Sequence, residues 1–171
     1  LAPSVRGGLN HEFIHSARLD NLASCHAAIN ALVSSNAKDT IQIAALFDHE
    51  EVGSVSEGGA ESGIMENLMR EILIAFCGSD AELRNIVGRS VFLSADMAHG
   101  LHPHFSDRHD SVEDNRPRLG GGVTVKINQN RRYATSAATL ALFNDICRTH
   151  ALPHQTYTHR NDLPCGSTIG P

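Results

Sequence analysis

Short apolar runs alternate along this chain with longer segments whose apolar residues recur every three or four positions. The compact runs Ile41–Phe47 and Val91–Leu93 are typical of buried strands. A third strand is predicted over Val123–Ile127, where apolar residues alternate with others, and a weaker one near Gln155–Thr158. This spacing of short runs favours a sheet whose strands are separated by longer elements.

Three segments between these runs have the apolar spacing of an amphipathic helix. Helices are predicted over Asn21–Ser34, Ile64–Phe76 and Ala134–Thr149, while Gly100–Gly122 is expected to be a long loop. Strands that alternate with helices indicate an α/β fold. We expect a three-layer α/β/α domain with a largely parallel mixed sheet.

Composition narrows the class of protein. The 171 residues are 41% hydrophobic and 19% charged, which is typical of a folded globular domain. No apolar run approaches the roughly 20 residues that a membrane-spanning helix needs. The net charge of -5 gives no reason to expect nucleic acid or an anionic membrane as a partner.

The cysteines and histidines are spread along the chain. Four cysteines lie far apart without a CxxC pair, which argues against a thiolate zinc site and a disulfide framework; they are Cys25, Cys77, Cys147 and Cys165. Reduced thiols and a cytoplasmic location are therefore expected. Eleven histidines are scattered, although four crowd one segment: His99, His102, His104 and His109.

Acidic residues directly follow two of the predicted strands. Asp48, Glu50 and Glu51 come after the run that ends at Phe47, and Asp96 follows the next run. Ligand sites in open α/β sheets collect at the carboxyl ends of the strands. We therefore expect these carboxylates at one edge of the sheet, where the first helix could bring its leading aspartate.

Carboxylates that converge without a cation repel one another, and a divalent metal removes that conflict. Two metals bridged by one carboxylate are a recurrent means of activating water. Each residue also has a simpler interpretation: Asp20 as a helix N-cap, Glu50 and Glu51 as solvent-facing charges, and Asp96 as a turn residue. Local sequence leaves both interpretations open.

Five segments occur in the order and spacing of one peptidase family. The chain resembles the M18 aspartyl aminopeptidases in SARLDNL, FDHEEVGS, SADMAHGLHP, VKINQNRRYAT and NDLPCGSTIGP, which are Ser16–Leu22, Phe47–Ser54, Ser94–Pro103, Val125–Thr135 and Asn161–Pro171. Together they span nearly the whole chain from about Phe13 onward. The resemblance implies a zinc-peptidase fold.

The resemblance also implies roles for individual residues. Asp20 would bridge two zinc ions, Glu51 and Asp96 would be further zinc ligands, and Glu50 would be the general base. Such enzymes remove N-terminal Asp or Glu from peptides and assemble as homo-oligomers. An acidic substrate side chain calls for a fixed cation or donors, and the substrate-contact candidates are Lys126, His102 and Tyr133. His99 is either a partner of a metal-binding carboxylate or a loop histidine.

Residues 1–171 are expected to be a partial catalytic domain. The resemblance implies two histidine zinc ligands from flanking motifs and an inserted oligomerisation domain, none of which is among these residues. An oxygen-only ligand set binds zinc less selectively than one with imidazoles. We therefore expect this chain by itself to bind zinc weakly and to hydrolyse little peptide.

Three alternatives remain at this point. A related M42-type aminopeptidase shares the architecture and the EEVG-like segment. A non-catalytic α/β fragment with a structural or interaction role would explain the missing histidines. A nucleic-acid-binding domain has little support, because Arg131 and Arg132 are the one notable basic pair and lie inside a peptidase-like segment.

Overall fold

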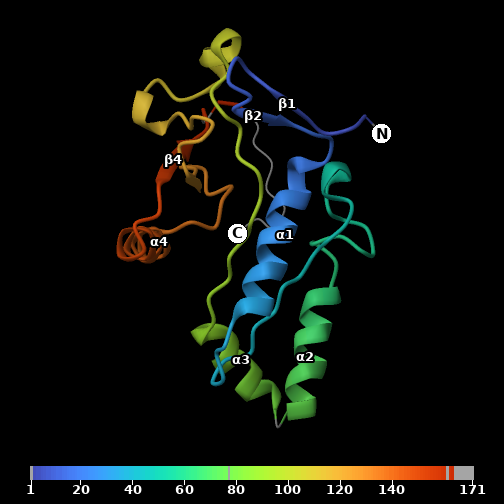
Figure 1. The fold of residues 1–171 in the computed structure, drawn as a ribbon. Coiled ribbons are helices and arrows are strands. Elements are labelled where there is room, and N and C mark those ends of the chain that lie inside the picture. The colour runs from blue at the N-terminus through green and yellow to red at the C-terminus, as the bar shows by residue number, and fades with distance from the viewer. Residues whose placement is uncertain (1, 77, 161, 164–171) are drawn as a thin grey trace. The chain divides into compact units, whose positions relative to one another are not determined.

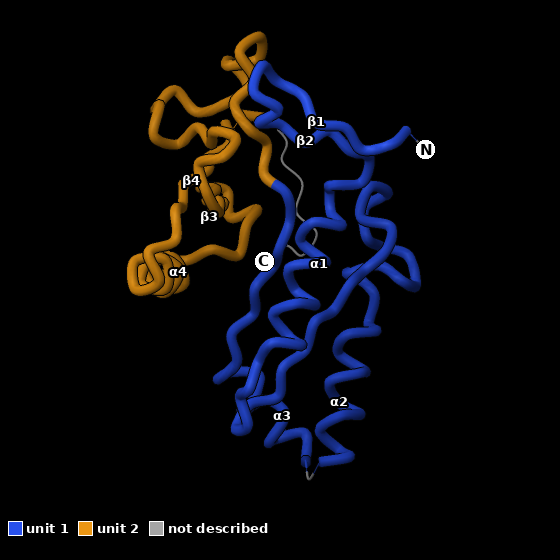
Figure 2. Tube along the Cα trace, in the orientation of Figure 1, with its two compact units in different colours: residues 1–97 blue, residues 98–171 orange. Residues whose placement is uncertain are grey.

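The computed structural model describes residues 2–76, 78–160 and 162–163. The chain divides into two compact units, Leu1–Met97 and Ala98–Pro171, coloured separately in Figure 2. Each unit has its own secondary structure and is described by itself. Cys77, Cys165 and most of the segment Asn161–Pro171 lie outside the described residues.

In its described residues, unit 1 combines a small hairpin with three α-helices and a 3₁₀ helix (Figure 1). Its elements are β1 (Val5–Gly7), β2 (Phe13–His15), α1 (Leu19–Ser34), a 3₁₀ helix (Glu50–Val52), α2 (Ile64–Phe76) and α3 (Asp80–Arg89). The strands β1 and β2 pair antiparallel. Arg70 of α2 forms an ion pair with Asp80 at the start of α3, with 3.4 Å between the guanidinium and carboxylate atoms.

The prediction of helices over Asn21–Ser34 and Ile64–Phe76 is confirmed by α1 and α2. The interpretation of Asp20 as an N-cap is wrong. The N-cap is Arg18, in the left-handed region at φ 66°, and Asp20 lies in the first turn with φ −83° and ψ 112°. Asn21 is also non-helical, so regular α-helix geometry begins just after it.

Helix α3 was not among the predicted elements, although its start has a clear local signal. The Ser79 hydroxyl accepts a hydrogen bond from the backbone N–H of Glu82 at 3.4 Å, and Ser79 N–H donates to the Glu82 carboxylate at 2.7 Å. This reciprocal pair is a capping box. The Ser79 N–H, and after it the Ser79 hydroxyl, hold the pKa of Glu82 below its usual value.

The strands predicted over Ile41–Phe47 and Val91–Leu93 do not form. Within the described ranges the ladders between named strands join β1 to β2 and β3 to β4, and neither run takes part. Their side chains are correspondingly exposed, with Ile41 at 53% and Leu93 at 79%. An apolar run can become a strand only where a neighbouring strand satisfies its backbone groups, and these runs have no such neighbour here.

Unit 2 is built around a βαβ unit. Strand β3 (Val123–Ile127) leads through helix α4 (Ala137–Thr149) to strand β4 (His154–Thr158), and the two strands pair in parallel with Lys126 opposite Tyr157. The predicted strands at both positions are confirmed, as is the α/β class. The long loop before β3 contains two 3₁₀ helices, Pro103–Arg108 and Glu113–Asn115.

Helix α4 begins three residues later than predicted because Ser136 caps it. The Ser136 hydroxyl accepts a hydrogen bond from Thr139 N–H at 3.2 Å. Near the helix end, Cys147 is buried, and the ring of Phe143 meets that of His154 at 5.8 Å between centroids. These contacts tie α4 to the start of β4.

Few side chains are buried in either unit. Among the described residues other than glycine, the buried apolar ones are Leu73, Pro117, Cys147 and Tyr157, and the buried polar ones are Ser54, His109 and Asn128. In the same part of the chain, none of the helices combines the length and apolar character needed to cross a membrane.

The entry into β3 depends on Gly122. Its φ is +100°, and a Cβ there would lie 2.1 Å from the Pro153 carbonyl oxygen, which accepts the Val123 N–H at 3.0 Å. Gly122→Ala should lower the free energy of unfolding by about 2–4 kcal/mol, since backbone strain and a steric clash add. Urea unfolding followed by circular dichroism measures this change.

The matched control is Gly120→Ala. Gly120 also has a positive φ of +79°, but a Cβ there would meet nothing within 4 Å. This variant should lose only about 1 kcal/mol from the backbone term. Equal losses for the two variants would show that the contact with Pro153 does not matter.

Candidate active site

Two of the candidate metal ligands lie on adjoining segments of unit 1. The side-chain amide Nδ2 of Asn21 donates a hydrogen bond to the carbonyl oxygen of Ala95 at 2.9 Å. Beside it, the Ser24 hydroxyl donates to the sulfur of Met97 at 3.9 Å. Because Asn21 follows Asp20 and Ala95 precedes Asp96, these two bonds align the segments that carry both aspartates.

The candidate glutamates occupy a tight loop of the same unit. Glu50 and Glu51 open the 3₁₀ helix, which starts from His49 at φ 62° and closes with a hydrogen bond from Gly53 N–H to the Glu50 carbonyl at 2.9 Å. Buried Ser54 anchors the loop. Its N–H donates to the His49 carbonyl at 3.0 Å.

The same loop is closed on its far side by residues that come after it. Glu61 N–H donates to the Ser54 carbonyl at 3.1 Å, and the His49 ring nitrogen Nδ1 lies 2.6 Å from the Ser56 hydroxyl. Both glutamates remain exposed. The loop is therefore held by its backbone, and its two carboxylates are presented outward.

The carboxylates are not assembled into a closed metal site. Across residues 2–76, 78–160 and 162–163, no three His, Cys, Asp or Glu side chains are grouped so as to hold a metal ion. Among the described residues, two buried side-chain atoms have no hydrogen-bond partner, His109 Nδ1 in unit 2 and Asn21 Oδ1 in unit 1, and Asn21 lies next to Asp20. The candidate ligands Asp20, Glu51 and Asp96 offer carboxylate oxygens only, and these fit part of a metal centre.

Two of the three substrate-contact candidates meet in unit 2. The Lys126 ammonium lies 5.7 Å from the centroid of the Tyr133 ring, within range of a cation–π interaction. Both side chains are half-buried. The sequence placed them in one segment, but only the fold of the intervening turn brings them together.

His102 has different neighbours. Its ring nitrogen Nδ1 accepts the N–H of His104 at 3.2 Å, and its ring lies 5.1 Å from that of Phe105. It is exposed and caps the 3₁₀ helix Pro103–Arg108. The structure therefore gives it a local structural contact in unit 2.

A buried histidine was not singled out from the sequence. His109 is 8% exposed, its ring meets Tyr157 edge-on at 6.1 Å, and its backbone bridges to His159. Tyr157 in turn has its hydroxyl 2.8 Å from His159 Nδ1. The crowding of histidines between positions 99 and 109 was the available signal, but it does not reveal which ring is buried.

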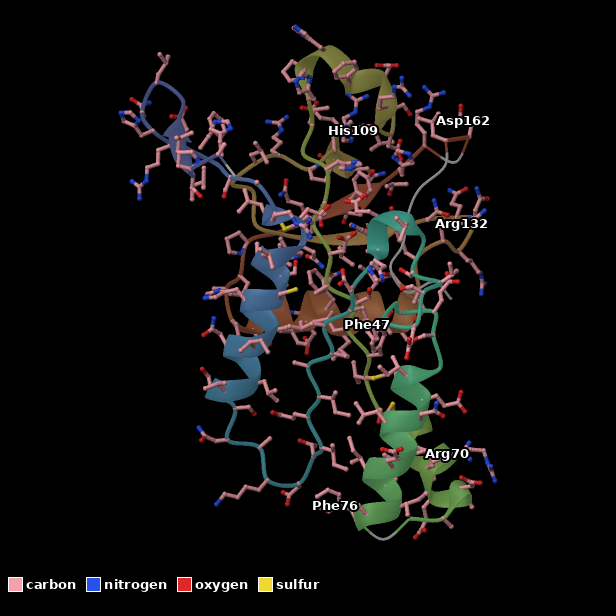
Figure 3. All side chains as sticks on the ribbon, turned by 90° about the vertical axis from the view of Figure 1, so that its right-hand side faces the viewer. Phe47, Arg70, Phe76, His109, Arg132 and Asp162 are labelled. Atoms are coloured by element: carbon pink, nitrogen blue, oxygen red, sulfur yellow. The ribbon has the colours of Figure 1, made fainter. Side chains whose placement is uncertain are left out.

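The surroundings of His109 depress its basicity. Burial, and after it the nearby charges of His99, His159 and Arg116, lower the pKa of His109 from its ordinary value of 6.5. An open cavity of about 540 Å³ adjoins it, lined by Ser106, Asp107, His109, Asp110, Ser111, Arg116, His159, Arg160 and Asp162. Figure 3 labels His109 and Asp162 of this lining.

Comparison with known proteins identifies the family. The profile of the family described as "Aminopeptidase I zinc metalloprotease (M18)" matches residues 1–171. The chain belongs to the M18 family. This confirms the resemblance drawn from the five segments and sets aside the M42 alternative.

Curated M18 relatives are substantially longer than this chain. A Ricinus communis protein named "Probable aspartyl aminopeptidase" is 45% identical over 176 residues, covering 99% of this chain and 35% of that protein. A Pseudomonas paraeruginosa protein named "Probable M18 family aminopeptidase 2" is 46% identical over 164 residues, covering 96% and 37%. The chain thus spans little more than a third of their length.

Solved M18 structures share its fold. A chain in the cryo-EM structure of the Ape4 and Nbr1 complex is 37% identical with a TM-score of 0.80, covering 96% of this chain and 32% of that one. The S. cerevisiae mApe1 dodecamer has a TM-score of 0.77 at 24% identity, covering 92% and 37%. At that lower identity the likeness concerns the fold alone.

Because burial lowers the pKa of His109, the folded chain should lose stability as the pH falls below about 6.5. In this range the unfolded histidine takes up a proton more readily than the folded one, so protonation favours unfolding. Urea unfolding at pH 7.5 and 5.5 measures the effect. His109→Gln should flatten this pH dependence, whereas the exposed control His150→Gln should leave it unchanged.

The loop that presents the two glutamates offers a second test. A Cβ on Gly59 would lie 2.1 Å from the Ser54 carbonyl oxygen, while a Cβ on Gly58 would meet nothing within 4 Å. Gly59→Ala should therefore displace Ser54 and speed amide exchange at Glu61 by at least about tenfold, because that N–H loses its acceptor. Gly58→Ala should leave the exchange rate as it is, and equal rates in both variants would contradict this account.

Proposed function

We propose that this chain is the carboxylate-bearing part of an aminopeptidase that removes Asp or Glu from peptide N-termini with a two-zinc centre. M18 membership supports the peptidase class and the use of zinc. The geometric observation that supports the site is the hydrogen bond from Asn21 to Ala95, because it aligns the segments of Asp20 and Asp96. Carboxylates from segments far apart in the sequence are thereby placed on neighbouring backbone.

The proposed roles of the carboxylates are those that the resemblance to the M18 family implies. Asp20, Glu51 and Asp96 would hold the metal, with Asp20 bridging the two ions. Zinc, when bound, supplies the Lewis-acid chemistry that lowers the pKa of water. Glu50, exposed at the start of its 3₁₀ turn, would accept a proton from the attacking water and pass it to the leaving amine.

Recognition of the acidic substrate residue is assigned to unit 2. The Lys126 ammonium would pair with the substrate carboxylate, and the Tyr133 ring beside it would orient that ammonium. His102 is a further proposed substrate contact. Its exposed ring has the donor and acceptor atoms that a peptide backbone requires.

We further propose a homo-oligomeric assembly and a cytoplasmic location for the protein. Cys25 and Cys147 are free thiols, as a reducing compartment favours. The exposed apolar runs of unit 1, such as Val91–Leu93, are surfaces that stable proteins normally cover. Peptides with an N-terminal Asp or Glu are the proposed substrates.

The general-base role predicts a specific kinetic signature. In the zinc-loaded aminopeptidase of which this chain is proposed to be a part, Glu50→Gln should lower kcat for an Asp-terminated peptide by about 10²–10⁴, because the amide cannot accept the proton. Zinc affinity measured by calorimetry should stay unchanged. Glu57→Gln, an exposed change in the same loop, is the matched control and should leave kcat unaltered.

Zinc affinity measured by calorimetry distinguishes the proposed metal ligands Glu51 and Asp96 from the proposed base Glu50. Glu51→Ala and Asp96→Ala should each weaken zinc binding at least about tenfold, since each removes a charged ligand. Unchanged zinc binding in both variants would favour the non-catalytic interpretation of the chain. Faster cleavage of Leu-terminated than of Asp-terminated peptides would overturn the proposed specificity.

A further inference from the structure

Asn128 is one of the few buried polar residues in the described chain, at 8% exposure, and it comes directly after strand β3. Its backbone carbonyl accepts the N–H of Arg131 at 3.1 Å. Its side-chain oxygen Oδ1 accepts the N–H of Arg132 at 3.3 Å. One residue therefore binds two consecutive backbone donors across a turn.

This double contact determines how the chain leaves β3. Arg131 has φ 54°, in the left-handed region that a residue with a side chain seldom adopts unless its surroundings hold it there. With both N–H groups bound to Asn128, the backbone reverses direction over positions 128–132. The next residue is Tyr133, whose ring then lies 5.7 Å from the Lys126 ammonium.

The segments before and after this turn are each held by contacts of their own. Lys126 belongs to β3 and pairs in register with buried Tyr157 of β4. On the other side of Tyr133, Ser136 is held by the capping box of α4, where its N–H donates to the Thr139 hydroxyl at 2.8 Å. The turn at Asn128 thus connects strand β3 to the start of helix α4, and its conformation sets where Tyr133 lies between them.

Arg132 contributes through its backbone in this arrangement. Its side chain is exposed on the loop that follows β3, as the label in Figure 3 locates it. The hydrogen bond to Asn128 Oδ1 is donated by the Arg132 N–H. The side-chain oxygen at position 128 therefore contacts the backbone of the turn directly.

We propose that Asn128 is a positioning residue for substrate specificity: it holds Tyr133 against Lys126 and so sets the affinity of this pair for an acidic side chain. The inference rests on the proposed function of Lys126 and Tyr133 as substrate contacts. Asn128 itself does not contact the substrate. It acts by fixing the turn that positions Tyr133 against Lys126.

Three variants of the full chain test the proposal. Asn128→Ala removes the oxygen that binds Arg132 N–H. Asn128→Asp keeps an oxygen acceptor at the same position and should preserve the turn. Asn144→Ala, an exposed change on α4, is the matched control.

The tyrosines provide a direct readout of the turn. The chain has two tyrosines and no tryptophan, so ring-labelled tyrosine gives separate NMR signals for Tyr133 and Tyr157 that Tyr157→Phe assigns. In Asn128→Ala the Tyr133 signal should move to the position of a solvent-exposed tyrosine, and Lys126 should lose its ring-current shift. The Tyr157 signal reports in the same spectrum that the β3–β4 sheet is intact.

Ligand affinity is measured on the same signals with L-aspartic acid α-amide and L-leucine amide as probes. Asn128→Ala should weaken binding of the aspartic acid amide about tenfold, the effect expected when a buried donor loses its partner. The leucine amide should produce no Tyr133 shift in any variant.

The outcomes separate the two levels of the proposal. An unmoved Tyr133 signal in Asn128→Ala, or a displaced one in Asn128→Asp, would overturn the positioning role. A displaced Tyr133 with unchanged affinity for the aspartic acid amide would support the turn but overturn the assignment of Lys126 and Tyr133 to substrate binding. Loss of the Tyr157 signal as well would make Asn128 a residue of general folding and also overturn the proposal.

Discussion

The hydrogen bond between Asn21 and Ala95 is the contact on which the candidate centre of unit 1 depends. It joins residues 74 positions apart. Closing a loop of that length costs chain entropy, although the cost grows only slowly with loop length. Because the two aspartates flank this bond, the free energy that pairs the segments also brings two like charges onto neighbouring backbone. Like charges that come close repel one another unless a counter-charge offsets them, and the proposed metal centre would supply that charge.

The two units differ in how the backbone of their candidate segments is hydrogen-bonded. In unit 1 the candidate catalytic groups lie on segments held mostly by loop hydrogen bonds, with the apolar runs that precede them exposed. In unit 2 the proposed substrate contact Lys126 belongs to a formed parallel ladder, opposite buried Tyr157. The proposed assignment of chemistry to unit 1 and of recognition to unit 2 therefore matches a difference in how many backbone groups each unit pairs internally.

Sequence reasoning succeeded where the signal was local. The helices α1 and α2 have apolar spacing that needs no distant partner, and β3 alternates visibly over Val123–Ile127. It failed over Ile41–Phe47, where burial as a strand requires a neighbouring strand that a pattern cannot supply. The spacing of Ser79 and Glu82 is a local signal for the capping box that begins α3. The meeting of Lys126 and Tyr133 could not be predicted, since it depends on a turn whose side-chain contact has no sequence period.

The 3₁₀ helix at Glu50–Val52 has a consequence for the paired glutamates. With three residues per turn, successive side chains point about 120° apart around the axis. Glu50 and Glu51 are chemically identical neighbours, yet they face different directions and cannot exchange duties. A one-residue insertion ahead of His49 would rotate the pair by about a third of a turn. It would keep both carboxylates in the sequence, but Glu50 would take the direction of Glu51 and Glu51 would take that of Val52. The proposed role of each glutamate therefore depends on its phase along the backbone as well as on its residue type.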